Sequence, residues 1–466
     1  RCICRRQSFH SSSSSCTLEG EIELNQVHPP HFYLSLLRSC IALKSLRRAR
    51  LIHSHLIHHR FDLSGPLGDH LIMTLAKCGG LDDAFSLFNT LPNPTIFSLT
   101  SILSALDDSG HADMSLHVYF HHMNHHQTLH PDAYTFVSLF KACGNVHNRE
   151  VGKILHHQAC ESGACLYIYV ANTLVSMYGK CASVEEAKAV FGQIVCQNVV
   201  SWNAIISVYV ENRCGEKALL LFRQMVEENI TPNKQSFILA LQACGILEAD
   251  ITEDWPSTEI GLEIGHAFHA DIHKKGFCAD VFIGTTLVSM YGKCGMITQA
   301  HNAFNGITFA NTVSWNAIIS AYMDQDEGRS ALQLYWKMHK EGVTPDLQTY
   351  LIVLQACGLL VAGGKLESNS NSSTAMCLEI GQALYLDCQM KGFISDAVIC
   401  SSLMSLFSKC GSIIGAESIF YSFSGCDTVI WNMMLSTYSN DGQAAKALQL
   451  CKKILDESML LSDATV

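Results

Sequence analysis

The chain has 466 residues, of which 48% are hydrophobic and 16% are charged. Its 31 Lys plus Arg stand against 42 Asp plus Glu, a formal net charge of -11, which excludes strong general attraction to polyanions. The apolar content permits an extensive packed core, yet no apolar run approaches the roughly 18 residues that a membrane-spanning helix requires.

The first residues have the composition of a targeting segment. Arg1, Arg5 and Arg6 are followed by serines at 11–15, and no acidic residue precedes Glu19. A sequence rich in arginine and serine and poor in acids is typical of organelle transit peptides. We therefore expect residues 1–29 to be a transit-peptide remnant, and the protein to be located in a mitochondrion or chloroplast.

From residue 30 the sequence is repetitive. The segment SWNAIIS occurs at 201–207 and 314–320, a near copy occupies 430–436, and segments of the types ACG and SMYGKC recur between them in a fixed order. A fixed internal period indicates an array of repeats. Alignment on these anchors divides residues 30–462 into twelve motifs, mostly of 35, 31 and 35 residues: 30–64, 65–95, 96–132, 133–167, 168–198, 199–233, 234–280, 281–311, 312–346, 347–396, 397–427 and 428–462. Residues 463–466 are expected to begin a further motif.

Each motif is predicted to be a pair of helices. Apolar residues recur at i, i+3, i+4 and i+7 in the second halves, as at 187–194, and a Thr-Pro pair at 231–232 or 344–345 separates one pair from the next. One pair cannot bury both of its apolar stripes, so neighbouring pairs must stack. The prediction is an all-α solenoid of helix-turn-helix repeats. The insertions at 250–259 and 367–374 are expected to be exposed loops.

Catalytic and metal motifs were sought without success. The 21 cysteines recur at equivalent helix positions and are expected to be free and mostly buried, and no Cys-x-x-Cys occurs. The histidines at 121–126 favour a solvated helix face over a metal site. His339 and Glu341 match half of a zinc-deaminase signature, but its Pro-Cys-x-x-Cys is missing. We expect no catalytic residue, metal, cofactor or small-molecule substrate.

These motifs resemble the pentatricopeptide repeats of plant proteins that alternate standard, long and short forms. The segments at 200–207 and 313–320 resemble the standard form, 281–295 the short form and 134–144 the long form, and the match spans nearly the whole chain. The resemblance implies a right-handed solenoid that binds single-stranded RNA from an organellar transcript, one base per motif. It also implies cytidine-to-uridine editing, with editing-factor or deaminase partners or a deaminase-like domain beyond Val466.

Two positions distinguish the short and standard motifs. The fifth residue is polar: Asp69, Thr100, Asn172, Asn203, Thr285, Asn316, Ser401 and Asn432. The final residue is also polar: Thr95, Asp132, Asn198, Asn233, Asn311, Asp346, Asp427 and Ser462. In long motifs the fifth residue is aliphatic: Leu34, Val137, Ile238 and Leu351. One interpretation is helix capping by the fifth residue; the other, which we favour, is recognition of base edges.

The resemblance implies a base for most pairs, with the N-terminal motif at the 5′ end. The expected target is G, any, pyrimidine, pyrimidine, any, A, U, any, G, C, from the pairs Thr100/Asp132, Asn172/Asn198, Asn203/Asn233, Thr285/Asn311, Asn316/Asp346, Ser401/Asp427 and Asn432/Ser462. The second residue of each motif is expected to stack on bases, with core packing as the alternative: Phe97, Tyr169, Val200, Phe282, Val313, Val398 and Val429.

Charge and architecture leave other hypotheses open. The acidic balance predicts a shallow salt dependence of RNA binding and makes a helper protein plausible. Besides RNA recognition, the same architecture would suit a protein-binding scaffold of the tetratricopeptide kind, or the RNA-binding part of a longer editing enzyme. The aliphatic fifth residue of the long motifs favours RNA recognition over the scaffold.

Overall fold

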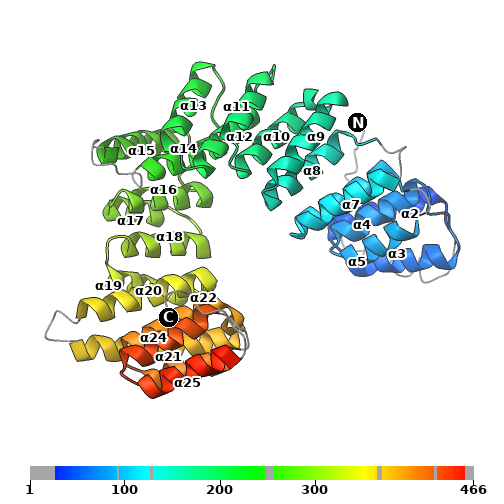
Figure 1. Cartoon of the computed structure of the whole chain (residues 1–466). Helices are drawn as coiled ribbons and strands as arrows, with labels where there is room; N and C mark the ends of the chain where they lie inside the picture. Colours follow the sequence, from blue (N-terminus) through cyan, green and yellow to red (C-terminus); the bar gives the residue numbers. More distant parts are fainter. Residues whose placement is uncertain are drawn as a thin grey trace, which may run out of the picture. The chain divides into compact units, whose positions relative to one another are not determined.

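A computed structural model describes residues 27–91, 94–125, 130–247, 257–364, 370–423 and 428–456 (Figure 1). Within these ranges the regular structure is entirely helical, with 24 α-helices, two short 3-10 turns and no strand. The predicted all-α class is therefore confirmed. Residues 1–26 of the expected transit-peptide remnant, and residues 463–466, lie outside the described ranges. No described helix combines the length and apolar character needed to cross a bilayer.

The chain forms two compact units, each described here by itself. The helices of the first unit are α2 (Pro30–Leu43), α3 (Leu46–His58), α4 (Pro66–Lys77), α5 (Leu81–Thr90), α6 (Ile96–Asp108), α7 (Ala112–His125), α8 (Ala133–Val146), α9 (Arg149–Glu161), α10 (Ile168–Lys180), α11 (Val184–Gln193) and α12 (Val199–Glu211), with the 3-10 turn η1 (Ala164–Leu166). The second unit holds α13 (Gly215–Glu227), α14 (Lys234–Leu247), α15 (Ser257–Lys274), α16 (Val281–Lys293), α17 (Ile297–Asn305), α18 (Thr312–Met323), α19 (Gly328–Lys340), α20 (Leu347–Gly364), α21 (Ser370–Met390), α22 (Ala397–Lys409), α23 (Ile413–Ser422), α24 (Thr428–Asn440) and α25 (Ala444–Asp456), with η2 (Phe393–Ser395).

Two helices fall within each of the twelve intervals. The first helix begins at the first residue of its interval, except α4, which begins one residue later at Pro66. The 31-residue intervals are shorter because their second helix is shorter: α11 has 10 residues, whereas α13 has 13. The division into family motifs, and the handedness of the solenoid, stay predictions.

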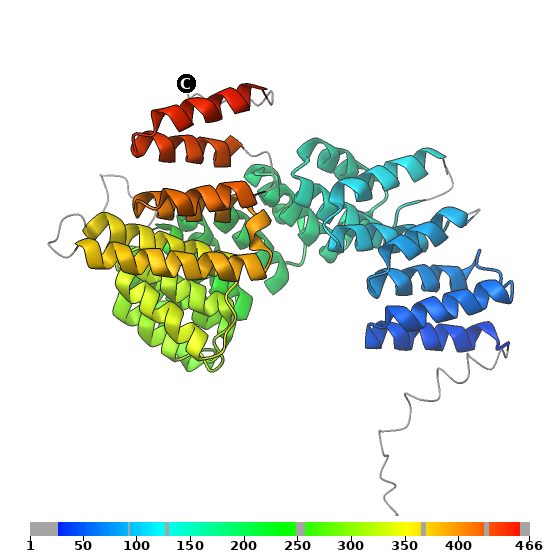
Figure 2. The same ribbon diagram turned by 90° about the horizontal axis from the view of Figure 1, so that it is seen from below.

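Within each unit, consecutive pairs stack in chain order. The first helix of one pair packs on the first helix of the next, as α8 on α10 and α10 on α12 in the first unit, and α16 on α18 in the second. Figure 2 shows the pairs from α20 and α21, in yellow, to α25, in red, lying one upon another. The apolar stripes are therefore buried between pairs rather than inside a separate core.

Edge-to-face aromatic contacts explain why the tryptophan segment recurs. The ring of Trp315 is 1% exposed and lies 4.7 Å from the ring of Phe304, a residue of the preceding second helix, at an angle of 67°. The same contact appears at three junctions: Phe191 with Trp202, Phe304 with Trp315, and Phe420 with Trp431. Such pairs stabilise packing beyond the area that they bury.

The glycine of the SMYGKC segments permits close packing of consecutive first helices. A Cβ atom built on Gly292 would lie 2.5 Å from the Cβ of Ala321, and one on Gly179 would lie 2.4 Å from Cγ2 of Val208. Any larger residue would push the next helix away. The cysteines of the ACG-type segments, as expected, are free and fully buried: Cys40, Cys143, Cys244 and Cys357.

The expectation of loops in the two insertions is partly wrong. Residues 248–256 and 365–369 lie outside the described ranges, but α15 begins at Ser257 and α21 begins at Ser370, so the ends of both insertions are helical. No proline lies within residues 257–274 or 370–390. Polar residues alone do not end a helix that continues into an apolar face.

Replacement of Trp315 by alanine is expected to destabilise the second unit by about 3–5 kcal/mol, because it removes a buried ring and its contact with Phe304. Trp336→Ala is the matched control, since that ring is 52% exposed and its loss should have little effect. Hydrogen exchange of the amides in α17 and α18 measures the difference. Equal exchange rates in the two variants would contradict this role of the aromatic contact.

Candidate nucleic-acid interface

The final residue of a motif caps the first helix of the next motif. Thr95, Asp132, Asn198 and Asn311 are the N-caps of α6, α8, α12 and α18, and in each the side chain accepts from the backbone N–H three residues later. The fifth residues lie one turn inside the preceding first helix instead. The capping interpretation is therefore wrong for the fifth residue and correct for the final residue.

A buried hydroxyl completes these caps. The third residue after each of these final residues is always serine or threonine, and each is fully buried: Ser98, Thr135, Ser201, Ser236, Ser314 and Thr349. We call the fifth residue of a motif, its final residue and this hydroxyl residue the junction triad. The sequence analysis did not recognise the hydroxyl residue, although its recurrence at one position was visible.

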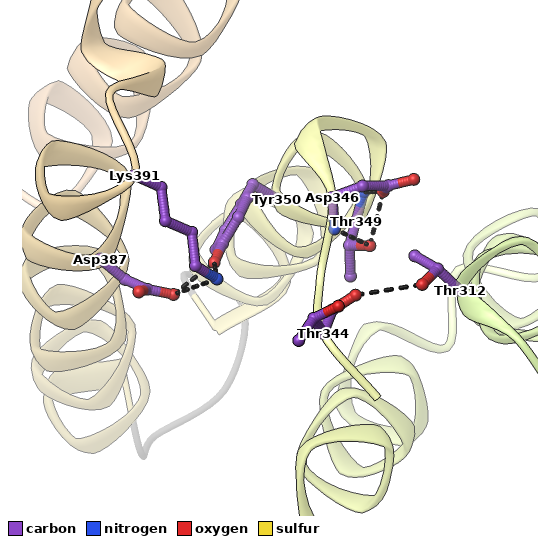
Figure 3. Close-up of polar contacts among 7 residues, drawn as sticks. All are labelled: Thr312, Thr344, Asp346, Thr349, Tyr350, Asp387 and Lys391. Atoms are coloured by element: carbon purple, nitrogen blue, oxygen red, sulfur yellow. Dashed lines mark hydrogen bonds and ion pairs between the residues drawn. The ribbon is translucent and has the colours of Figure 1, made fainter. Parts of the chain in front are cut away.

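The triad of motif 312–346 shows how the parts meet. Asn316 Nδ2 donates to Asp346 Oδ1 at 2.9 Å, and Thr349 Oγ1 lies 2.8 Å from both Asn316 Oδ1 and Asp346 Oδ1. The backbone N–H of Thr349 also donates to Asp346 Oδ1 at 2.9 Å. Figure 3 shows Asp346 and Thr349 at the start of α20, while Tyr350 turns away to contact Asp387 and Lys391 of α21.

Other triads meet through the hydroxyl. Thr285 Oγ1 lies 2.7 Å from Ser314 Oγ, and Ser314 donates to Asn311 Oδ1 from both its backbone N–H and its hydroxyl at 3.0 Å. Thr100, Thr135 and Asp132 repeat this arrangement, with 2.8 Å between the two threonine hydroxyls and 2.7 Å from Thr135 to Asp132. The fifth and final residues are thus brought together in motifs 96–132, 281–311 and 312–346, and also in motif 65–95, where Thr95 Oγ1 donates to Asp69 Oδ1 at 2.8 Å.

The remaining predicted pairs are described only in part. Asn172 is buried, and its amide oxygen has no hydrogen-bond partner among the described residues. Asn203 lies in the first unit and Asn233 in the second, where Asn233 caps α14 through Ser236. Ser401 is half-buried in α22 and Asn432 is half-buried in α24. Their predicted partners, Asp427 and Ser462, lie outside the described residues.

The junctions that follow long motifs are apolar instead. Where the long motif offers Val137, Ile238 or Leu351, the third residue of the next motif is Val170, Ile283 or Ile399, each with no exposed surface. In motifs 96–132, 281–311 and 312–346 a polar fifth residue occurs where the next helix supplies a hydroxyl, and these aliphatic fifth residues occur where it supplies a branched apolar side chain. Ser401 is an exception, because the third residue of the next motif is Ile430. Both kinds of junction satisfy the rule that buried polar groups need partners.

Hydrogen bonds keep Asp346 ionised. Burial raises the pKa of its carboxyl, but hydrogen bonds from Asn316 and Thr349 outweigh this effect, so the pKa lies below its usual value of 3.8. The carboxylate is therefore charged at neutral pH and acts as a hydrogen-bond acceptor.

The predicted stacking residues are all exposed. Their exposed fractions run from 39% at Tyr169 to 71% at Phe282, which contradicts the alternative that they pack in the core. Tyr169 stacks on Tyr134, the second residue of the preceding long motif, with ring centroids 5.6 Å apart, and Tyr134 is 66% exposed. An exposed stacked aromatic pair provides a flat apolar surface for a planar ligand.

A row of lysines was missed by the sequence analysis. Lys77, Lys180, Lys293 and Lys409 occupy the same position at the ends of α4, α10, α16 and α22, and all four are exposed. Glycines of the ACG segments make room for their stems, since a Cβ built on Gly144 would lie 3.1 Å from Cδ of Lys180. The signal was the lysine of the recurring GKC and SKC segments, which had served only as an alignment anchor.

First helices line a groove in the second unit. Its volume is about 560 Å³, and its walls come from α18, α20, α22 and α24. Gln355, Ser401, Ser405 and Lys409 supply its polar lining. A predicted base-recognition residue and one of the row of lysines therefore face the same space.

Replacement of Asp346 by alanine is expected to destabilise the start of α20 by about 1 kcal/mol, the usual cost of losing an N-cap. Asp346→Asn should be nearly neutral at pH 7, because Asn311 performs the same role. Since the folded pKa of Asp346 is lowered, its contribution is complete above the unfolded pKa of 3.8 and is lost as pH falls through the folded pKa. Thermal unfolding at pH 7 and pH 3 tests this; a pH-independent difference between Asp346 and the asparagine variant would contradict it.

Comparison with known families identifies repeats in five segments. A family model described as "PPR repeat family" matches residues 197–245 and 310–358, and one described as "PPR repeat" matches residues 169–199, 398–425 and 429–459. The segments 197–245 and 310–358 each contain a complete set of junction positions: Asn203, Asn233 and Ser236, and Asn316, Asp346 and Thr349.

Plant proteins are similar along most of the chain. The mitochondrial pentatricopeptide repeat-containing protein At3g02330 of Arabidopsis thaliana is 30% identical over 92% of this chain and 46% of its own length. The chloroplastic protein At4g18520 of the same plant is 27% identical over 92% of this chain and 65% of its own length. The chain thus spans about half to two thirds of the length of these relatives.

Solved structures of one such protein also match. The crystal structure of the pentatricopeptide repeat protein PPR10 from maize covers 97% of this chain and 80% of that chain, with a TM-score of 0.36 and 18% identity. The structure of PPR10 in complex with an 18-nt psaJ RNA element covers 96% and 79%, with a TM-score of 0.38 and 14% identity.

Proposed function

We propose that this chain, which contains pentatricopeptide repeats, is a sequence-specific single-stranded RNA-binding protein of a plant organelle. The observation that carries the proposal is the junction triad, which brings a polar fifth residue and a polar final residue together in motifs 65–95, 96–132, 281–311 and 312–346. Exposed second residues lie one turn earlier on the same first helices. The mitochondrial and chloroplastic relatives support the organellar location, and the alternation of standard, long and short motifs is part of the proposal.

The triad geometry supplies a physical means of base recognition. In motif 312–346 the hydrogen bonds that Asp346 accepts from Asn316 and Thr349 all reach its Oδ1, and the side chain of Asp346 is exposed. Oδ2 of Asp346 is then the acceptor offered to a base, and N3–H of uracil is a suitable donor on the Watson–Crick edge. The carboxylate cannot turn freely, because Asn316 and Thr349 fix it. Fixed donors and acceptors are what discrimination between bases requires.

The same reasoning extends to the expected target, read 5′ to 3′ as G, any, pyrimidine, pyrimidine, any, A, U, any, G, C. Thr285 with Asn311 would prefer A, and Thr100 with Asp132 would prefer G. The long motifs, with their apolar junctions, present no polar pair and therefore specify no base. Stacking on Phe97, Tyr169 and Phe282 would add about 1–3 kcal/mol per base without regard to sequence.

Phosphate contacts are assigned to the row of lysines. The net charge of -11 leaves the chain without a general attraction for RNA, but Lys409 and Ser401 line the same groove. One ammonium group in each group of three motifs would neutralise phosphates locally while the remaining surface stays acidic. The expected salt dependence is therefore shallow.

A more specific role, in RNA editing, is supported only by the resemblance to plant pentatricopeptide repeat proteins. We propose that recognition by this chain selects a cytidine for editing to uridine, with the chemistry supplied by a partner editing factor or deaminase. The residues of this chain would position the transcript and take no part in the deamination.

An exchange of preference from U to A tests base recognition. The double variant Asn316→Thr with Asp346→Asn reproduces the pair Thr285/Asn311 and keeps a capping residue before α20. The parent should bind an RNA with U at that position about tenfold more tightly than one with A, and the variant should show the reverse. Gel shifts with purified protein measure both.

Two controls accompany this exchange. Asn302→Thr, on the second helix α17, should leave the preference for U unchanged, and a base change at the position of motif 347–396 should leave the affinity of the parent unchanged. An unaltered preference in the double variant would exclude recognition by this pair.

Loss of the row of lysines should weaken binding to every RNA alike. Replacement of Lys180, Lys293 and Lys409 by alanine is expected to lower the slope of log affinity against log salt by about 0.7 for each lysine. The relative affinities for U and A should stay the same, because phosphates carry no sequence information. The control variant Lys188→Ala with Lys340→Ala removes exposed lysines from second helices. If this control weakened binding as strongly, the assignment of phosphate contacts would be wrong.

A further inference from the structure

One cluster of metal-binding side chains lies outside the proposed RNA interface. His156, Cys160 and Cys165 each place one ligand atom within 4.8 Å of the others, and no other such group of three His, Cys, Asp or Glu occurs among the described residues. His156 and Cys160 stand one turn apart on α9, and Cys165 lies in η1. The chain reverses between them at Gly163, where φ is +73°, in the left-handed region that glycine adopts without strain.

The two sulfur atoms stand at a distance that suits a shared metal ion. Cys160 Sγ and Cys165 Sγ are 3.3 Å apart. A disulfide would bring them to about 2.05 Å, whereas two thiolates on a tetrahedral zinc ion, with Zn–S bonds of about 2.3 Å, stand about 3.8 Å apart. The observed distance is closer to the second value, and an opening of about half an ångström would admit the ion.

The imidazole of His156 is oriented by a neighbouring helix. Its Nδ1 lies 2.9 Å from the hydroxyl of Tyr178, a residue of α10 that is 2% exposed. Metal-binding histidines are commonly oriented by a hydrogen bond to the nitrogen that does not bind the metal. The contact with Tyr178 therefore leaves Nε2 as the ligand nitrogen of His156.

We propose that His156, Cys160 and Cys165 bind one zinc ion. The cysteines would bind as thiolates, each releasing its proton to solvent, and His156 would bind as neutral imidazole through Nε2. Water would take the fourth position. Cys160 is exposed, and the other two residues are half-buried, so an ion can enter from solvent. Zinc is the class of metal expected for two thiolates and one imidazole in a tetrahedral arrangement.

The next long motif, 234–280, offers a natural comparison. His269, His273 and Cys278 have the same spacing in the sequence as the three proposed ligands. His269 contacts the hydroxyl of Tyr291 at 2.8 Å, so the contact between histidine and tyrosine belongs to the repeat itself. These three side chains are not gathered within ligand distance, however, since they do not form such a group. The proposed site is thus a feature of motif 133–167, created by Cys160 and Cys165.

A bound ion would connect three elements of the first unit. The ligands come from α9 and η1, and Tyr178 transmits the connection to α10. The turn between one motif and the next would then be held by metal as well as by packing. Because the ion binds only the folded arrangement, zinc should raise the thermal midpoint of the parent.

Cobalt substitution tests the site directly. The whole chain, purified without metal in a non-thiol reductant, should bind one cobalt(II) ion with a thiolate-to-metal charge-transfer absorption, and one equivalent of zinc should abolish that absorption. Cys160→Ser and Cys165→Ser should each lower zinc affinity at least about tenfold. Cys196→Ser, at an exposed cysteine outside the cluster, should bind as the parent does.

The possible outcomes of these measurements distinguish a zinc site at His156, Cys160 and Cys165 from its absence. Circular dichroism without metal establishes that each variant is folded, and the cobalt spectrum of the parent requires no variant. Absence of the charge-transfer absorption in the parent would overturn the proposal, and so would zinc affinity that is unchanged in both serine variants. Zinc binding without a thiolate signal would place the ion on other histidines and would also overturn it. None of these measurements involves RNA, so the result is independent of the proposed function.

Discussion

The arrangement of this protein depends on a hydrogen-bonded cap shared between consecutive motifs. A final residue such as Asp346 or Asn311 ends one motif and also caps the first helix of the next. It accepts a hydrogen bond from the backbone N–H of a residue whose hydroxyl side chain is fully buried. The four unsatisfied N–H groups at a helix start need partners wherever they are covered by a neighbour. Each cap therefore sets the start of a helix and the position of a polar group at the same point.

Much of the fold was predictable because the repeat signals are local. Helical periodicity and Thr-Pro breaks lie within a few positions of the helices that they delimit, and each first helix begins within one residue of the start of its interval. The triads were not predictable in the same way, because Asn316 and Thr349 meet across 33 residues. The same holds for Lys180, whose place beside Gly144 depends on the stacking of α8 and α10. The sequence favoured base recognition for the fifth and final residues, with helix capping as the alternative for the fifth, whereas the capping residues are the final ones.

The overall charge proved a poor guide to the local surface. A sum over all residues gives -11, while one position in each short motif carries an exposed lysine. At Lys180, Lys293 and Lys409 a glycine of the preceding motif lies beside the lysine side chain. An elongated stack has much surface relative to its volume, so an acidic surplus over the whole chain is compatible with positive positions at the ends of first helices such as α10 and α16. Charge in such proteins is better assessed position by position along the repeat than for the chain as a whole.

The cap also limits how these motifs can diversify. At the end of a short or standard motif such as 96–132 or 281–311, the side chain accepts a hydrogen bond from the next helix, and only a few short polar residues do this well. Tyr167, at the end of a long motif, makes no such bond. Natural and engineered sequences are therefore restricted to a few residue types at that capping position: aspartate, asparagine, serine and threonine. A lysine or glutamine there, however well suited to a particular nucleobase, would weaken the following helix. The range of RNA sequences that such a protein could recognise is thus limited by the residues that can cap a helix.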